Sequence, residues 1–232
     1  MRDRDLPPPA LPWSLLTLGT VGLLVLYVVA VRTTAGQEVD NAILWQLEAG
    51  PGLAQRLLPL VSALVPVALV LSAVVCLAGL ARGWRTALGA ATGVAVCLVT
   101  PQVLKLALPR PQLADPWPLP NSLPSGHAAA VAALVCALLV VVPRSARGAV
   151  LILGSVAVGV AGLLLITLGH HRASDIAASG CVGLIGWGAG LLVQQAWGGR
   201  EGQRREGQRR WPEERGGSFG GHSPSSDPSS AL

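Results

Sequence analysis

The sequence contains little charge for its length. Only 12% of its 232 residues are Asp, Glu, Lys or Arg, half of the ~25% found in soluble globular domains. A helix of about 20 apolar residues crosses the hydrocarbon core of a bilayer. Six windows near or above this length contain no charged residue: residues 6–31, 57–81, 86–104, 116–143, 148–171 and 176–199. The composition therefore excludes a soluble domain, a nucleic-acid-binding module and a secreted disulfide scaffold.

Cysteines are also few, and their positions favour neither a metal site nor a set of disulfides. All four fall inside the apolar windows: Cys76, Cys97, Cys136 and Cys181. Their spacing matches neither a zinc motif nor a disulfide framework. We therefore interpret them as small residues of a packed core.

The distribution of basic residues predicts how the spans are oriented. With the N-terminus on one side of six spans, twelve of the 17 Lys and Arg residues fall on that side and five on the other. Short cytoplasmic segments are enriched in Lys and Arg, so the side of the N-terminus is predicted to be the cytoplasm. The predicted fold is an all-α, six-span integral membrane helix bundle, with both termini cytoplasmic, in the cell (plasma) membrane.

The chain divides into a membrane domain and two flanking segments. Residues 1–10 are predicted to be a cytoplasmic segment, and residues 11–198 a six-helix transmembrane domain. Residues 199–232 repeat Glu-Gly-Gln-Arg-Arg and then become rich in Gly, Ser and Pro, which predicts a disordered cytoplasmic tail. The expected helices lie near residues 11–32, 57–81, 85–106, 126–143, 148–168 and 174–197.

The first outer segment, residues 37–56, has two interpretations. It is either a connecting loop or an interfacial helix with one apolar face. The residues of that face would be Val39, Ala42, Ile43 and Leu47.

The second outer loop contains two basic residues and ends at the predicted N-terminus of a helix. Lys105, the only lysine, and Arg110 precede a proline-rich stretch that holds side chains in place. The loop ends in Ser125-Gly126-His127, where Ser125 can cap a helix and free amides at its N-terminus can bind an anion. His127 could then protonate a leaving oxygen. The alternatives are a lysine that anchors the helix at the membrane interface and a plain cap followed by an exposed histidine.

The third outer loop pairs a histidine with a carboxylate. If a helix begins here, His171 and Asp175 are four residues apart and share a face, with Arg172 between them. A carboxylate bonded to one ring nitrogen leaves the other nitrogen free to act as a base or nucleophile. Together with the second loop, these residues indicate phosphoryl transfer through a covalent histidine.

These residues resemble the signatures of the phosphatidic acid phosphatase type 2 / vanadium haloperoxidase superfamily over about residues 100–180. Pro-Ser-Gly-His matches in full at 124–127, and the His, three residues, Asp half of another signature matches at His171 and Asp175. The resemblance implies a His171 nucleophile oriented by Asp175, and a His127 that protonates the leaving group. Lys105, Ser125 and Gly126 would bind the phosphoryl oxygens, and neither a metal nor a cofactor is implied.

The sequence departs from the family pattern in two places. Arg110 follows Lys105 after four residues instead of six, so that Gln112 holds the family's Arg position. Leu164 and Leu165 stand where the family has Ser-Arg, and loss of one such donor typically costs ~10²–10³ in rate. Arg110, from a shifted backbone, and Arg172 are the candidate substitutes for binding phosphate.

The resemblance predicts a metal-independent hydrolase of phosphoric monoesters or diphosphates that acts on a membrane lipid at the outer face. Its substrate would be a lipid phosphate or a polyprenyl diphosphate of a bacterial cell envelope, and the bilayer, rather than nucleic acid, would be its partner. The alternative is a catalytically weakened family member that binds lipid headgroups or a membrane partner, which the two leucines favour. A transporter is disfavoured because the spans contain no buried ionisable residues of the kind that mark a transport path.

Overall fold

The computed structural model describes residues 8–114 and 121–216, with side chains described up to Trp197, and shows no strand in this part of the chain. The all-α prediction is confirmed. The helices are α1 (Ala10–Leu26), continued by a π-helical turn (Tyr27–Val31), α2 (Thr34–Leu47), α3 (Pro51–Gly79), ending in a 3₁₀ turn (Leu80–Arg82), α4 (Trp84–Ala107), α5 (Gly126–Val141), α6 (Arg144–Thr167) and α7 (Ala173–Gly216).

Five segments in the described part of the chain are long and apolar enough to cross a membrane: Ala10–Val31, Pro51–Arg82, Trp84–Ala107, Arg144–Thr167 and Ala173–Trp197. All six predicted apolar helices are present, but α5 has only 16 residues. It is shorter than the charge-free window around it because that window also contains the proline-rich segment before Gly126. The count of six spans and the cytoplasmic position of both termini remain predictions.

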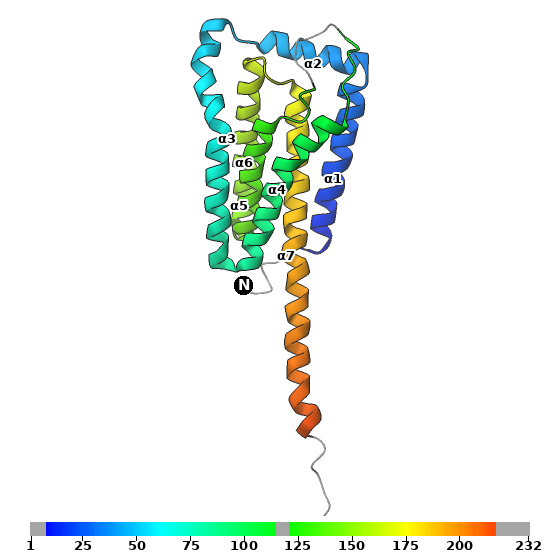
Figure 1. The fold of residues 1–232 in the computed structure, drawn as a ribbon, viewed down its shortest axis with the longest axis vertical. Coiled ribbons are helices and arrows are strands. Elements are labelled where there is room, and N and C mark those ends of the chain that lie inside the picture. The colour runs from blue at the N-terminus through cyan, green and yellow to red at the C-terminus, as the bar shows by residue number, and fades with distance from the viewer. Residues whose placement is uncertain (1–7, 115–120, 217–232) are drawn as a thin grey trace, which may run out of the picture. The chain divides into compact units, whose positions relative to one another are not determined.

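The chain divides into two units after Gln195. In the first unit, α1 and α3 to α7 run side by side, and α2 lies across one end of them (Figure 1). The segment before α5 and the short connection before α7 lie at this same end. The bundle therefore brings together the two loops, both predicted to be outer, that carry the predicted functional residues.

The second unit differs from the expectation for the tail. Helix α7 continues to Gly216, whereas the sequence predicts disorder from residue 199. Glu, Gln and Arg dominate this stretch and all three have high helix propensity, which explains why it can be helical. Residues 217–232, the rest of the predicted tail, lie outside the described part of the chain.

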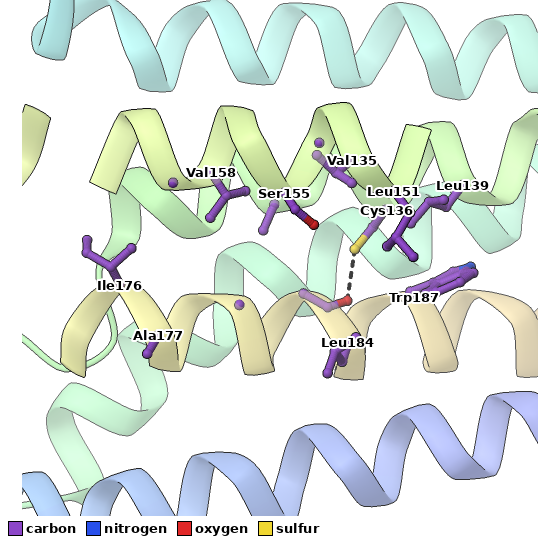
Figure 2. Close-up of a pocket in the computed structure, with 15 residues that line it drawn as sticks. Val135, Cys136, Leu139, Leu151, Ser155, Val158, Ile176, Ala177, Leu184 and Trp187 are labelled. Atoms are coloured by element: carbon purple, nitrogen blue, oxygen red, sulfur yellow. Dashed lines mark hydrogen bonds between the residues drawn. The ribbon is translucent and has the colours of Figure 1, made fainter. Parts of the chain in front are cut away.

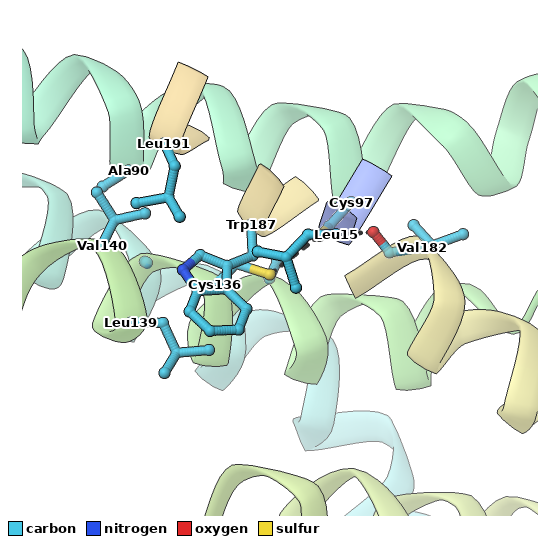
Figure 3. Close-up of a cluster of buried hydrophobic side chains, with 11 residues drawn as sticks. Leu15, Ala90, Cys97, Cys136, Leu139, Val140, Val182, Trp187 and Leu191 are labelled. Atoms are coloured by element: carbon cyan, nitrogen blue, oxygen red, sulfur yellow. Dashed lines mark hydrogen bonds between the residues drawn. The ribbon is translucent and has the colours of Figure 1, made fainter. Parts of the chain in front are cut away.

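Helix α5 lies deep in the first unit and packs against α3, α4 and α6. Its residues from Ala128 to Ala133 are all buried, and their small side chains allow neighbouring helices to approach closely. The main core cluster joins α5 to α1, α4 and α7 (Figure 3). Cys97 and Cys136 lie in this cluster as free thiols, so their interpretation as small core residues is confirmed.

Helices α4 and α7 approach each other closely where Gly93 of α4 lies against Gly186 of α7. A Cβ atom added to Gly186 would lie 2.4 Å from Cys97 Sγ and 2.8 Å from the carbonyl oxygen of Gly93. Both distances are too short for real contacts, and one involves backbone that cannot move aside easily. The distance between these helices therefore depends on the absence of a side chain at Gly186.

Replacing Gly186 with alanine should destabilise the protein by about 1–3 kcal/mol, the usual cost of overpacking a close contact. Gly180→Ala is the matched control on the same helix, because its Cβ would meet no described atom within 4 Å. Thermal unfolding of both variants in detergent measures the difference. Equal unfolding temperatures for the two variants would contradict the proposed packing constraint.

Helix α2 resolves the two interpretations of the first outer segment. The segment from Thr34 to Leu47 is helical, so the loop interpretation is wrong for these residues. The predicted apolar face points outward, with Val39 60% and Leu47 41% exposed. The opposite face is buried, and it contains Gln37, Asp40 and Asn41 as well as Leu44. Helix α2 thus buries polar side chains at the end of the bundle where the two outer loops meet.

Candidate active site

Asp175, in the first turn of α7, is the most buried charged residue of the site. Its Oδ2 accepts hydrogen bonds from Ser122 Oγ at 2.6 Å and from the backbone N–H of Arg172 at 3.0 Å. The same oxygen lies 3.2 Å from His171 Nδ1. His171 and Arg172 precede the helix, so Asp175 reaches back across the helix start in the manner of a capping box. The histidine–carboxylate contact expected from the four-residue spacing is therefore present.

This contact determines which nitrogen of His171 can react. A carboxylate beside Nδ1 favours the tautomer with its proton on Nδ1, which leaves Nε2 with a free lone pair. His170, the neighbouring histidine, is exposed and its backbone N–H is bonded to Leu165 O at 3.0 Å. The two adjacent histidines thus differ in environment, and His171 is the one held by a carboxylate.

Ser125 caps the N-terminus of α5 and is linked to α7. Its Oγ accepts a hydrogen bond from Ala128 N at 3.3 Å, as an N-cap does. Its backbone N–H donates to Asp175 O at 3.1 Å, and its carbonyl accepts from Ser179 Oγ at 2.9 Å. The hydroxyl proton of a serine that accepts in this way is still available to a ligand. The start of α5 is therefore fixed against the start of α7.

Lys105 lies beside the N-terminus of α5. A Cβ placed on Gly126 would be 3.9 Å from Lys105 Nζ and 3.6 Å from Gln102 Nε2. The ammonium group and the positive end of the α5 dipole thus occupy the same region, which favours an anion. This position agrees with a binding role for Lys105 better than with a membrane-interface anchor alone.

His127, the second residue of α5, faces the same region. Its ring centroid lies 6.4 Å from that of His171, and the two ring planes are inclined by 62°. His127 is half-buried. The structure thus brings His127 of α5 close to His171, which precedes α7 and is 44 residues away in the sequence.

Arg110 lies between two carboxylates. Its Nη2 is 3.5 Å from Asp40 Oδ2, and its Nη1 is 3.8 Å from Asp175 Oδ1. Its side chain is 6% exposed. Within the described part of the chain, neither Arg110 Nη1 nor Asp175 Oδ1 has a hydrogen-bond partner. Buried donors are normally satisfied, so Nη1, whose described partner is the long ion pair with Asp175, is an exception in this site.

Arg172 is held more completely. Its Nε donates to Asn41 Oδ1 at 3.2 Å, and its Nη1 donates to Ser122 Oγ at 3.4 Å. Burial and the nearby Arg110 lower the pKa of Arg172, while Asp175 and Asp40 oppose this shift. Arginine still remains protonated in proteins. Arg172 therefore contributes a positive charge to the site, although two of its nitrogens are already bonded.

Asp40 and Asn41 of α2 belong to this network, and sequence reasoning missed both. Asp40 accepts hydrogen bonds from the backbone N–H of Ser174, at 3.0 Å, and from its hydroxyl. Burial raises the pKa of Asp40, while the bonds from Ser174 and the charge of Arg110 act in the opposite direction. A signal was available, since Gln37, Asp40 and Asn41 follow the spacing of one helical face.

The position of the missing family arginine is apolar in this structure. Leu165 is fully buried and packs in a cluster with Val61 and Ala128, and Leu164 lies against the same cluster. A cation therefore does not reach the site from this part of α6. Among the described residues, no group of three or more His, Cys, Asp or Glu side chains is arranged to hold a metal ion.

The comparison with known families agrees with this geometry. Residues 84–198 match the PAP2 superfamily. The matched segment extends from α4 into α7 and contains every residue of the site except those on α2. No curated protein and no solved structure matches the chain. Through residues 84–198, the chain belongs to the PAP2 superfamily, and this membership supports a phosphatase-type activity in general.

Proposed function

We propose that the protein is a membrane phosphatase that hydrolyses a lipid phosphate or diphosphate through a phosphohistidine. The contact between His171 Nδ1 and Asp175, with His127 on the facing helix, carries this proposal. Phosphoryl transfer depends mainly on positioning and on stabilising negative charge. Lys105 and the N-terminus of α5 supply positive potential beside the two histidines.

In the first step, His171 Nε2 attacks the phosphorus atom while the bond to the leaving oxygen breaks. His127 donates a proton to that oxygen, so the leaving group departs as the lipid alcohol or as the singly protonated lipid monophosphate. Lys105, Ser125, the Gly126 amide and Arg110 bind the phosphoryl oxygens. Transfer in line requires the attacking and leaving atoms to lie on opposite sides of phosphorus. An imidazole on α5 and another in the connection before α7, 6.4 Å apart between ring centroids, suit that requirement.

In the second step, the neutral His127 removes a proton from water. The water oxygen attacks the phosphorus, the phosphorus–nitrogen bond breaks, and inorganic phosphate leaves. His171 and the proton on His127 are thereby restored. Every proton in the cycle is carried by the chain's own side chains or by water.

The groove below the site supports a lipid substrate. It lies among α5, α6 and α7, has a volume of about 330 Å³, and is lined almost entirely by apolar atoms (Figure 2). One end is formed by Ile176 and Ala177, directly after Asp175, and the other reaches Trp187. We propose that the hydrocarbon chain of the substrate lies here while its phosphate enters the site. From the distribution of basic residues, we propose that the site faces the outer leaflet and that both termini are in the cytoplasm.

Purified protein in detergent should release phosphate from at least one of phosphatidic acid, phosphatidylglycerol phosphate and a polyprenyl diphosphate. His127→Ala should lower this release by ~10²–10⁴, the usual contribution of a general acid. His170→Ala is the matched control, because the His170 side chain is exposed and acts on His127 only through a minor electrostatic interaction. Absence of release from all three lipids would contradict the proposed activity.

A second function is favoured by one observation, the apolar environment of Leu165 at the position of the family arginine. A protein without that arginine could bind lipid phosphates with little turnover. Saturable vanadate binding combined with no phosphate release would select this alternative.

A further inference from the structure

Helix α2 contributes a buried polar face that the family match does not include. Gln37, Asp40 and Asn41 are each at most 5% exposed, and α2 ends at Leu47, well before the matched segment begins at residue 84. Burying polar side chains is costly unless their hydrogen bonds are made. Each of these side chains bonds to a loop of the candidate active site, and these bonds hold specific parts of that site in place.

The first two residues hold the chain around Arg110. Gln37 Nε2 donates to Pro111 O at 2.7 Å, and Gln37 Oε1 accepts from Leu113 N at 3.1 Å. Asp40 Oδ2 lies 3.5 Å from Arg110 Nη2. Helix α2 thus binds both the backbone after Arg110 and its guanidinium group.

The same face also holds the loop of the proposed nucleophile. Asn41 Oδ1 accepts from Arg172 Nε at 3.2 Å, and Asp40 accepts from Ser174 N at 3.0 Å. One turn of α2 therefore contacts both arginines of the site. It also bridges the outer loop that contains Arg110 to the outer loop that contains Arg172.

Asp40 also has an electrostatic role beside Asp175. Arg110 lies between these two carboxylates, with Nη2 toward Asp40 and Nη1 toward Asp175. Without the charge of Asp40, Arg110 would be drawn to Asp175 alone. Arg110 would then compete with His171 for that carboxylate. Its Nη1, which has no described hydrogen-bond partner, would no longer be available to a phosphoryl oxygen.

We propose that Asp40 and Asn41 are positioning residues, which hold Arg110 and Arg172 in place to stabilise a phosphoryl group in the site. This inference rests on the proposed phosphatase function. Arg110 Nη1 binds a phosphoryl oxygen, and Asp40 keeps it available by holding Nη2. Arg172, fixed by Asn41, supplies a stationary positive charge beside the nucleophile. This α2 pair offsets the loss of the family arginine at Leu165.

Double-mutant cycles test whether each α2 residue acts through its arginine. Asp40→Asn should lower kcat/KM and vanadate affinity by about 10- to 100-fold, as loss of an orienting partner typically does. In an Arg110→Ala background, Asp40→Asn should cause no further loss, because the asparagine still offers an oxygen to the backbone N–H of Ser174. Asn41→Ala should likewise lose its effect in an Arg172→Ala background. Asp40→Glu should restore part of the activity, since it restores the charge.

Glu38→Gln is the matched control, because Glu38 lies on the exposed face of the same helix. It should leave kcat/KM and vanadate affinity unchanged. Thermal unfolding of each variant separates loss of fold from loss of positioning. If Asp40 has only a structural role, Asp40→Asn should lower the unfolding temperature. It should then lower kcat/KM by the same factor in the Arg110→Ala background as in the wild type.

The outcomes separate this inference from the function on which it rests. Suppose that the wild type releases phosphate. The positioning role is overturned if Asp40→Asn has the same kcat/KM as the wild type. It is also overturned if Asp40→Asn lowers kcat/KM by the same factor in the Arg110→Ala background as in the wild type. If the wild type binds vanadate without releasing phosphate, the hydrolase proposal fails. The cycles in vanadate affinity still decide the role of α2 in that case. A wild type that does neither overturns both proposals.

Discussion

Replacing His171 with alanine should abolish phosphate release from every lipid phosphate that the protein hydrolyses. Removing the nucleophile of a catalytic set typically lowers kcat by about 10⁴–10⁶, because the remaining groups have no covalent step to assist. Of the adjacent histidines, His171 has Asp175 at Nδ1, 3.2 Å away. His170 is exposed, so His170→Ala is the matched control and should retain activity.

The covalent step itself can be measured. Brief incubation with a ³²P-labelled substrate, followed by denaturation, should leave an acid-labile and base-stable label on the wild type and on His170→Ala. His171→Ala should carry no label. Label on His171→Ala, or a kcat within tenfold of the wild type, would exclude His171 as the nucleophile.

Replacing Asp175 with asparagine should lower kcat by about 10³–10⁴ while the fold is kept, as the equivalent change does in the triad of a serine protease. An amide can still accept a hydrogen bond from Ser122, but it no longer favours the reactive tautomer of His171 or stabilises the charge on its ring. The variant should bind vanadate, since Lys105 and the α5 N-terminus remain in place. Single-turnover kinetics and vanadate titration measure the two effects separately.

Two further variants define the role of Asp175. The double variant His171→Ala, Asp175→Asn should be no slower than His171→Ala, because the carboxylate acts through the histidine. Asp175→Ala should also lower the unfolding temperature, since removing one partner of a buried ion pair costs about 3–5 kcal/mol. Independent losses in the double variant would assign Asp175 a role apart from His171.

Local patterns in the sequence predicted much of the fold and part of the site. Apolar windows located the helices, and the serine cap located the start of α5, because both depend on residues close together in the chain. The contact between His171 and Asp175 was predictable for the same reason. The helix expected near residues 126–143 agrees with α5, although the charge-free window from 116 to 143 also includes the proline-rich loop before it.

The contacts of α2 were not predictable in this way. Asp40 meets Arg110 across 70 residues, and Asn41 meets Arg172 across 131. Such pairings depend on how the bundle brings its loops together, and a local pattern does not contain that information. The spacing of polar residues on α2 indicated a face, but only the tertiary structure identified its partners.

The close contact at Gly186 determines the tilt of α7, and a small change in this tilt moves the residues at the start of the helix by a larger distance. Asp175 precedes Gly186 by eleven residues, a distance of about 16 Å along a helix, so a tilt of about 5° at Gly186 would move Asp175 by about 1.4 Å. Displacements near 1 Å can reduce catalysis 10²-fold. A single methyl group at Gly186 would thus cause a small tilt of α7 and a larger displacement at Asp175. This displacement would reduce turnover at a smaller tilt than the one that unfolds the protein.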